Sequence, residues 1–389
     1  MKNKRPPGTP TTASHGGDLL GASRLALEAV SGVTALVEAV HMNVLNRAIG
    51  TPAMRPVAGI TSLVYRSVKG VTALVGGGID GALRKLGPLL TQPPAWAGRE
   101  GLIAALNGVV GDRLEHSANP LAIQMRLIPV GDPGSRVVVL VHGLCMNHLQ
   151  WQRDGIDHGA MLAANGGYST VYLHYNSGRH VSENGRDFAD QLQLLLEAWP
   201  VAIEEIVLIG HSMGGLVARS ACHYAAGAQH SWLKHLKSMV FLGTPHHGAP
   251  LERGGNWVHL ITDLSAYSAP FSRLAKIRSA GITDLRYGSV LDEDWKGKDR
   301  FEHGLHPLFL ALPAGVPCLA IAATTEKDKD SKTGDGLVPL ASALGEHPDK
   351  RRRLQLHKQV VPTCNHMQLL SSSDVGQRLR LFLTDSRLS

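Results

Sequence analysis

Beyond about residue 120, short apolar runs alternate along the chain with segments of helical periodicity. Residues 136–141, Arg-Val-Val-Val-Leu-Val, are typical of a strand buried on both faces, because β-branched residues follow one another without polar alternation. The clearest helical segment repeats its apolar residues through Phe188, Leu192 and Leu196. The predicted strands cover residues 121–129, 136–141, 169–175, 205–209, 238–243, 317–322 and 354–361, and a closing helix covers 375–383. This alternation predicts an α/β fold with a mostly parallel sheet and helices on both faces.

The first 110 residues follow a different pattern. Residues 1–16 are rich in Pro, Thr, Gly and Ser, which predicts a disordered tail. Apolar positions then recur at helical spacing, and the sequence Gly-Val-Thr-Ala-Leu-Val occurs at 32–37 and again at 70–75. Two copies are too few for a solenoid, so residues 17–110 are predicted to form a helical hairpin.

The predicted hairpin admits two interpretations. Its broad Ala- and Val-rich faces either pack on the following domain, or they contact a membrane or lipid surface through residues 17–90 or cover the mouth of an active site. The first 100 residues hold eleven Lys or Arg against five acidic residues, so they carry +6 of the net charge of +7. Attraction to an anionic partner would therefore come from this quarter of the chain.

Residues 111–389 are predicted to form one catalytic domain, and residues 246–312 interrupt its alternation of strands and helices. This stretch contains Gly254-Gly255 and several aromatic residues in helical fragments. An insertion of this length between strands predicts a cap or lid over the active site.

The composition of the 389-residue chain, with 43% hydrophobic and 18% charged residues, is that of a globular protein. Four cysteines without C-x-x-C spacing favour free thiols in a reducing compartment over a disulfide framework or a zinc site. The basic start at 2–5 has no apolar stretch behind it, and no run of 18 apolar residues occurs. We expect a cytoplasmic protein, peripheral to the inner face of the membrane if the hairpin binds lipid, with no nucleic-acid partner.

The stretch Gly210-His211-Ser212-Met213-Gly214 lies between a predicted strand and a helical pattern. A sharp strand-to-helix turn raises a serine Oγ above the sheet edge, and Gly210 and Gly214 leave room for the backbones to approach. The context therefore predicts a nucleophilic Ser212. The alternative is a glycine-rich turn whose serine only caps the helix.

A serine nucleophile needs a base and an acid that orients the base, and in this topology both follow the serine on loops after late strands. Asp335 follows the strand at 317–322, and His366 follows the last strand. Asp328 and Asp330 belong to a mixed charge run typical of a solvated loop, and glycines bracket Asp335 instead. The less well placed candidates for the base are His246, His247 and His357.

The tetrahedral intermediate of acyl transfer also needs two backbone donors. Met213 follows the nucleophile, so its N–H is one candidate. The other is the N–H of Leu144, in the sequence His142-Gly143-Leu144 after the second strand. His142 could instead be only the last strand residue, with its ring tied to the loop.

Five motifs together resemble the α/β-hydrolase lipases and esterases, and most closely the bacterial group similar to GPI inositol-deacylase-like hydrolases. They are Val141–Leu144, Gly210–Gly215, Gly243–Gly248, Asp335–Val338 and Asn365-His366, and Tyr175–Gly178 with Glu183–Gly185 also resembles that group. The resemblance covers residues 120–389. It implies an α/β-hydrolase fold and hydrolysis of carboxylic esters, with lipids as the substrate class.

Related bacterial lipases carry an aspartate calcium ligand two residues beyond the catalytic histidine, where this chain has Gln368. We therefore expect no metal and no cofactor. The leading hypothesis is a serine esterase or lipase that forms an acyl-enzyme on Ser212. The alternatives are an acyltransferase that uses the same acyl-enzyme, and a non-catalytic lipid- or granule-surface binding protein on a hydrolase fold.

Overall fold

The structure is a computed structural model that describes residues 21, 24, 99–249, 279–298, 307–328 and 333–385. The predicted tail at 1–16, the predicted hairpin apart from residues 21, 24 and 99–110, and the central part of the predicted lid lie outside these residues. The chain divides into two units, Met1–Trp96 with His116–Ala122, and Ala97–Glu115 with Ile123–Ser389. In the first unit, the Asn119 side-chain amide donates a hydrogen bond to the Gly21 carbonyl over 3.0 Å.

The second unit contains a seven-stranded sheet in the order β1-β5-β2-β6-β7-β8-β9. Strand β1 pairs antiparallel with β5 at one edge, and all other pairs in this sheet are parallel. The strands are β1 Arg126–Val130, β2 Arg136–Val141, β5 Ser169–His174, β6 Glu205–His211, β7 Leu236–Leu242, β8 Cys318–Ala323 and β9 His357–Val361. A two-stranded ribbon, β3 Gln152–Arg153 with β4 Ile156–Asp157, lies apart from this sheet.

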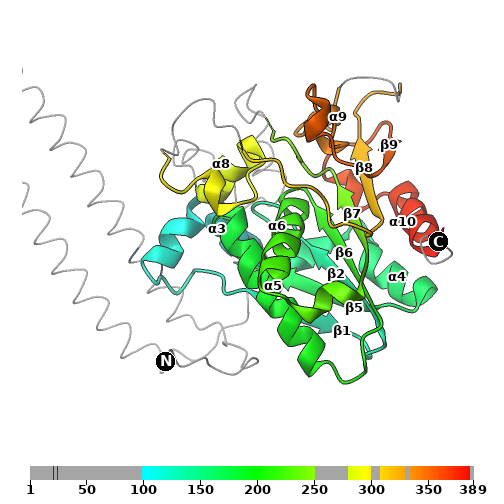
Figure 1. The fold of residues 1–389 in the computed structure, drawn as a ribbon, viewed down its shortest axis with the longest axis horizontal. Coiled ribbons are helices and arrows are strands. Elements are labelled where there is room, and N and C mark those ends of the chain that lie inside the picture. The colour runs from blue at the N-terminus through cyan, green and yellow to red at the C-terminus, as the bar shows by residue number, and fades with distance from the viewer. Residues whose placement is uncertain are drawn as a thin grey trace, which may run out of the picture. The chain divides into compact units, whose positions relative to one another are not determined.

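Helices cover both faces of the sheet, with α5 and α6 on one face and α4 and α10 on the other (Figure 1). The α-helices are α3 Arg99–His116, α4 His158–Gly166, α5 Val181–Ala198, α6 Met213–Gly227, α8 Ala280–Tyr287, α9 Leu340–Ala343 and α10 Ser373–Asp385. Helix α3 continues past residue 110, where the sequence analysis places the start of the catalytic domain. Within the described residues, no helix is both long and apolar enough to cross a membrane.

The central strands form the core because their side chains are apolar on both faces. Residues 137–141 of β2 and 206–209 of β6 have no exposed surface. Burying a valine or isoleucine side chain contributes about 2 kcal/mol, so this pair of strands is a major source of stability. The fold confirms the mostly parallel sheet, and the first and last strands start later than the sequence predicts, at Arg126 and His357.

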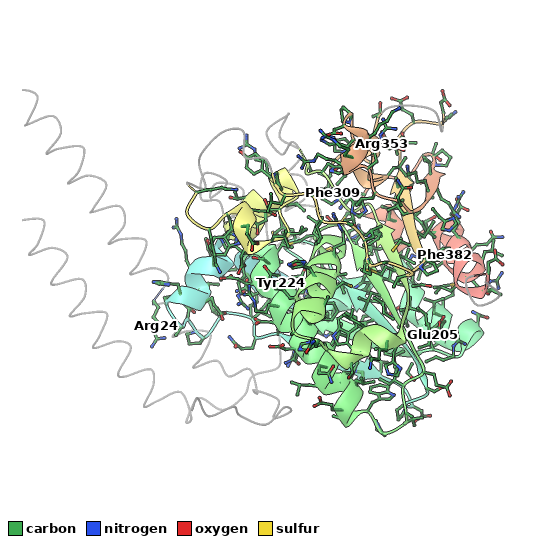
Figure 2. The ribbon with its side chains drawn as sticks, in the orientation of Figure 1. Arg24, Glu205, Tyr224, Phe309, Arg353 and Phe382 are labelled. Carbon is green, nitrogen blue, oxygen red and sulfur yellow. The ribbon has the colours of Figure 1, made fainter. Side chains whose placement is uncertain are left out.

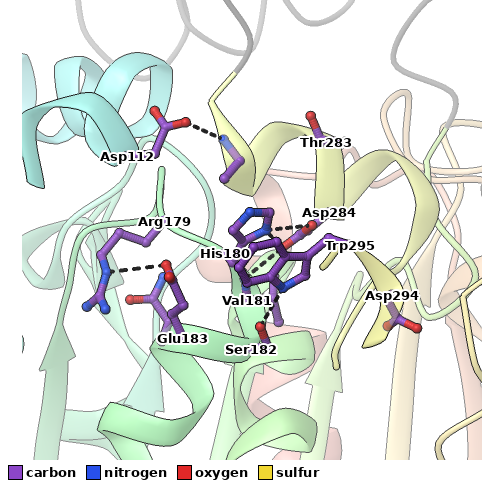
Figure 3. A network of polar contacts seen from close by, with 12 residues as sticks. Asp112, Arg179, His180, Val181, Ser182, Glu183, Thr283, Asp284, Asp294 and Trp295 are labelled. Carbon is purple, nitrogen blue, oxygen red and sulfur yellow. Dashed lines mark hydrogen bonds and ion pairs between the residues drawn. The ribbon is translucent and has the colours of Figure 1, made fainter. Parts of the chain in front are cut away.

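The described part of the insertion is held against the N-terminus of α5 (Figure 3). Asp284 of α8 accepts hydrogen bonds from the Val181 N–H (2.8 Å) and from His180 Nδ1 (3.0 Å). The Trp295 ring stacks on the His180 ring with centroids 3.6 Å apart and donates from Nε1 to Ser182 Oγ (2.9 Å). These contacts hold Asp284 and Trp295 against the start of α5, and a lid role for the insertion stays a prediction.

Candidate active site

Ser212 lies between the end of β6 and the start of α6, in a backbone conformation that L-residues seldom adopt (φ 54°, ψ −124°). Its N–H donates to the Leu242 carbonyl (2.8 Å), which ties the turn to β7. A Cβ at Gly214 would lie 2.1 Å from the Val141 carbonyl oxygen, so only glycine fits there. Strained residues of this kind cluster at functional sites. The Ser212 side chain makes no capping hydrogen bond to α6, so the structure does not support the capping alternative.

Asp335 and His366 form a buried pair, with 2.6 Å between Asp335 Oδ2 and His366 Nδ1. The other carboxylate oxygen accepts hydrogen bonds from the N–H groups of Leu337 (3.0 Å) and Val338 (2.8 Å). The His366 N–H also donates to the Asp335 carbonyl (3.0 Å). A carboxylate accepts only, so Nδ1 carries a hydrogen, and the neutral form of the ring has its lone pair on Nε2. Of the competing acids, Asp328 is exposed and Asp330 lies outside the described residues.

His211 connects the serine turn to the histidine loop. Its Nε2 lies 3.1 Å from the His366 carbonyl oxygen, and the two rings are 4.7 Å apart. Complete burial holds the pKa of His211 well below its usual range, so the ring is neutral and Nε2–H is the donor. The sequence analysis gives His211 no role. In the sequence, the feature that could have marked His211 is its position as a polar residue at the end of an otherwise apolar strand, directly before the serine.

Gly243 also helps to position this pair. Its φ of 58° is in the left-handed region, and a Cβ there would lie 3.1 Å from both Asp335 Oδ2 and His366 Nδ1. A larger residue would displace the pair, which gives the Gly243–Gly248 motif a physical reason.

The turn 142–144 lies against Ser212, since a Cβ on Gly143 would be 3.1 Å from the Ser212 Cβ. Burial lowers the pKa of His142 to about 3, so its ring is neutral. Its Nδ1 donates to the Gly143 carbonyl (2.9 Å), and its Nε2 accepts from the Tyr175 N–H (3.4 Å). The Tyr175 hydroxyl donates to the His142 carbonyl (2.8 Å) and its ring stacks on the imidazole, so Tyr175 fixes the turn.

These contacts bear on the two predicted backbone donors. The next N–H after Leu144, that of Cys145, already donates to Ser177 Oγ (3.0 Å). Met213 is the first residue of α6, where backbone N–H groups have no partner within the helix. The turn and the helix start are therefore adjacent to Ser212, and the oxyanion role of Leu144 and Met213 remains a prediction.

Gln368 closes the loop that carries His366. Its Oε1 accepts from the Asn365 N–H (2.8 Å), and its own N–H donates to Asn365 Oδ1 (2.9 Å). The amide thus forms hydrogen bonds at the position where related lipases carry a calcium ligand. The described residues contain no group of three or more side chains suited to bind a metal.

Comparisons with known proteins bear on the fold. Residues 132–313 match the family model described as PGAP1-like alpha/beta domain. Among curated proteins, none matches the chain.

Several solved structures are similar at low sequence identity. The mature Bacillus licheniformis lipase BlEst2 is 15% identical with a TM-score of 0.43, over 68% of this chain and 98% of that chain. The Pyrococcus furiosus esterase Pf2001 is 14% identical with a TM-score of 0.41, over 68% of this chain and 87% of that chain. The Burkholderia cenocepacia protein Cfl2 is 15% identical with a TM-score of 0.39, over 67% and 92%.

The mostly parallel sheet, with helices on both faces and a strained serine directly after a central strand, is consistent with the description of the matched family model as an alpha/beta domain. Residues 132–313 are thus similar to a PGAP1-like alpha/beta domain, and the chain has the mostly parallel, helix-covered sheet of the α/β-hydrolase fold.

Proposed function

We propose that the protein is a serine hydrolase that cleaves carboxylic esters through an acyl-enzyme. The proposal rests on the buried Asp335–His366 pair at 2.6 Å, in which the carboxylate accepts the hydrogen bond from Nδ1 and leaves Nε2 to act as a base. His211 ties the loop that carries His366 to the turn that carries Ser212. The resemblance of the sequence motifs to lipases and the apolar N-terminal segment support lipid esters as the substrate class. Contact of residues 17–90 with a lipid surface is part of the same proposal.

In the proposed reaction, Ser212 Oγ attacks the ester carbonyl carbon while His366 Nε2 takes the hydroxyl proton. The carbonyl oxygen becomes an oxyanion that accepts hydrogen bonds from the N–H groups of Leu144 and Met213. Collapse breaks the bond to the alcohol, which leaves with the proton from His366. Water then attacks the acyl-enzyme by the same route and releases the acid. Asp335 holds the imidazole in the required tautomer and stabilises the imidazolium.

Labelling with an alkyl fluorophosphonate tests the proposal. The intact protein is expected to form one adduct on Ser212 and none on Ser373, an exposed serine at the start of α10. Esters of increasing acyl length should protect Ser212 with increasing efficiency if lipids are the substrates. A folded protein that forms no adduct on Ser212 favours the non-catalytic binding protein, and protection by short soluble esters alone contradicts the lipid preference.

Gly143→Ala tests the oxyanion turn. The added Cβ would lie 3.1 Å from the Ser212 Cβ and 3.2 Å from Met146 Sδ, so the turn must shift by a few tenths of an ångström. Losing one oxyanion donor typically lowers kcat by roughly 10²–10³-fold, which sets the upper limit of the expected loss, with KM little changed. Gly227→Ala on α6 is the matched control, because its Cβ would meet nothing within 4 Å. Wild-type kcat in Gly143→Ala contradicts the role of the turn.

A further inference from the structure

A cavity of about 160 Å³ lies apart from Ser212, Asp335 and His366. We call it the basic pocket, because three arginines and three histidines line it: Arg219, Arg286, Arg352, His246, His247 and His347. The described part of its wall contains no Asp or Glu. The segment 307–310 closes one side, and its Phe309 is partly exposed (Figure 2).

Arg219 provides a buried positive charge in this wall. It is 4% exposed and projects from α6. Its Nη2 donates to the Leu310 carbonyl (2.6 Å), whereas its Nε has no hydrogen-bond partner. Burial lowers the pKa of Arg219 only to about 10, so the side chain stays charged at neutral pH. The charge of Asp294 raises this pKa, but no described carboxylate forms an ion pair with the guanidinium. A buried charge that forms no ion pair is costly, and a bound anion would offset that cost.

His246 adds a directed donor next to this charge. The ring is 3% exposed, and Nδ1 lies 3.4 Å from Arg219 Nη1. The guanidinium can only donate, so Nδ1 accepts and Nε2 carries the hydrogen. That Nε2–H has no partner, and neither do Nε2 of His247 and Nε of Arg352. Buried polar atoms are nearly always paired, so the residues of this wall carry polar groups with unused hydrogen-bonding capacity.

The side chains that line the basic pocket indicate which class of ligand it would bind. Guanidinium groups bind tetrahedral and planar oxyanions through paired N–H donors, and Arg is favoured where phosphate is recognised. A cavity needs only about 15 Å³ to hold a water, so 160 Å³ leaves room for a phosphate group. We propose that the basic pocket binds a phosphate-type oxyanion, supplied either as free phosphate or as the phosphate group of a larger molecule.

The pocket is connected to the serine turn by two elements. Arg219 follows Ser212 by about two turns of α6, roughly 10 Å along the helix axis. His246 follows the end of β7, and the Leu242 carbonyl of that strand accepts the hydrogen bond from the Ser212 N–H. A molecule that carries both an ester and a phosphate could thus occupy both places. Phosphate binding itself does not depend on the proposed hydrolysis.

Calorimetric titration of the full chain with inorganic phosphate, at constant ionic strength set with sodium chloride, tests the proposal. Arg352→Gln should weaken binding at least tenfold, because Arg352 lines the pocket. Arg351→Gln is the matched control: Arg351 carries the same charge one residue earlier, is exposed, and pairs with Asp349 over 2.9 Å. Its affinity for phosphate should equal that of the unmodified protein. Arg219→Met should abolish binding, and the Arg351/Arg352 pair keeps the test decisive if that variant does not fold.

Glycerol 3-phosphate distinguishes the two sources of the anion. Binding at least tenfold tighter than that of inorganic phosphate assigns the pocket to a larger phosphorylated molecule, and equal affinities assign it to free phosphate. Ser212→Ala should bind both ligands unchanged, which separates this proposal from the proposed catalysis. Absence of saturable binding, or equal weakening by Arg351→Gln and Arg352→Gln, overturns the proposal.

Discussion

Ser212→Ala is expected to lower kcat for ester hydrolysis by roughly 10⁶-fold, the loss typical of removing the nucleophile of a serine triad. The free energy of unfolding should change by less than about 1 kcal/mol, because alanine has the same Cβ and the Ser212 side chain does not cap α6. Steady-state kinetics on purified protein and urea unfolding measure the two quantities. Full turnover by the purified variant would refute the role of Ser212.

A double variant tests whether the three residues act together. If Ser212, His366 and Asp335 act as one unit, adding His366→Ala to Ser212→Ala should lower kcat no further, because the effects of such residues are not additive.

Asp335→Asn alone should lower kcat roughly 10⁴-fold, because it favours the wrong tautomer of His366. Asp328→Asn, at an exposed position, is its matched control and should retain activity. An equal loss in both aspartate variants contradicts the choice of Asp335.

The sheet and the histidine partner could be predicted from the sequence because local signals encode them. Runs such as 136–141 are apolar without alternation, and every strand of the seven-stranded sheet falls within or beside a predicted range. Glycines on either side of Asp335 mark a turn, whereas Asp328 lies in a mixed charge run, and the structure pairs His366 with Asp335.

Other features depend on contacts between segments far apart in the chain. Arg219 lies seven residues after Ser212, where a sequence reading gives an ordinary helix residue, and its burial arises from the segments around 246 and 310. The hydrogen bond from His211 to the His366 carbonyl spans 155 residues. No periodicity or motif spacing encodes such pairings.

Acidification is expected to unfold the protein, because several histidines are held neutral: His142, His174, His211 and His246 are buried, and His247 is half-buried. Burial lowers the pKa to about 3 for His142, about 2 for His174 and about 4 for His247, and well below the usual range for His211 and His246. In the unfolded chain, these rings take up protons near pH 6.5. Their contribution to stability is therefore complete above pH 6.5 and is lost as the pH falls from there toward the folded pKa values. Burial raises the pKa of Asp284, so this carboxyl group changes stability in the opposite sense. Its effect is confined to pH values above its ordinary pKa of 3.8.

The expected loss of stability on acidification follows from proton linkage. Each buried histidine lowers the free energy of unfolding by about 1.4 kcal/mol per pH unit well below 6.5, and the half-buried His247 by less, so the five together remove roughly 6 kcal/mol per unit. A domain is typically stable by about 5–15 kcal/mol, so the midpoint of acid unfolding should lie near pH 5. Urea unfolding followed by tryptophan fluorescence between pH 7.5 and 5.5 measures the slope. His174→Asn should reduce it by one proton, whereas His223→Gln, at an exposed position of α6, is the control. A stability that stays constant over this range contradicts the neutral, buried state of these rings.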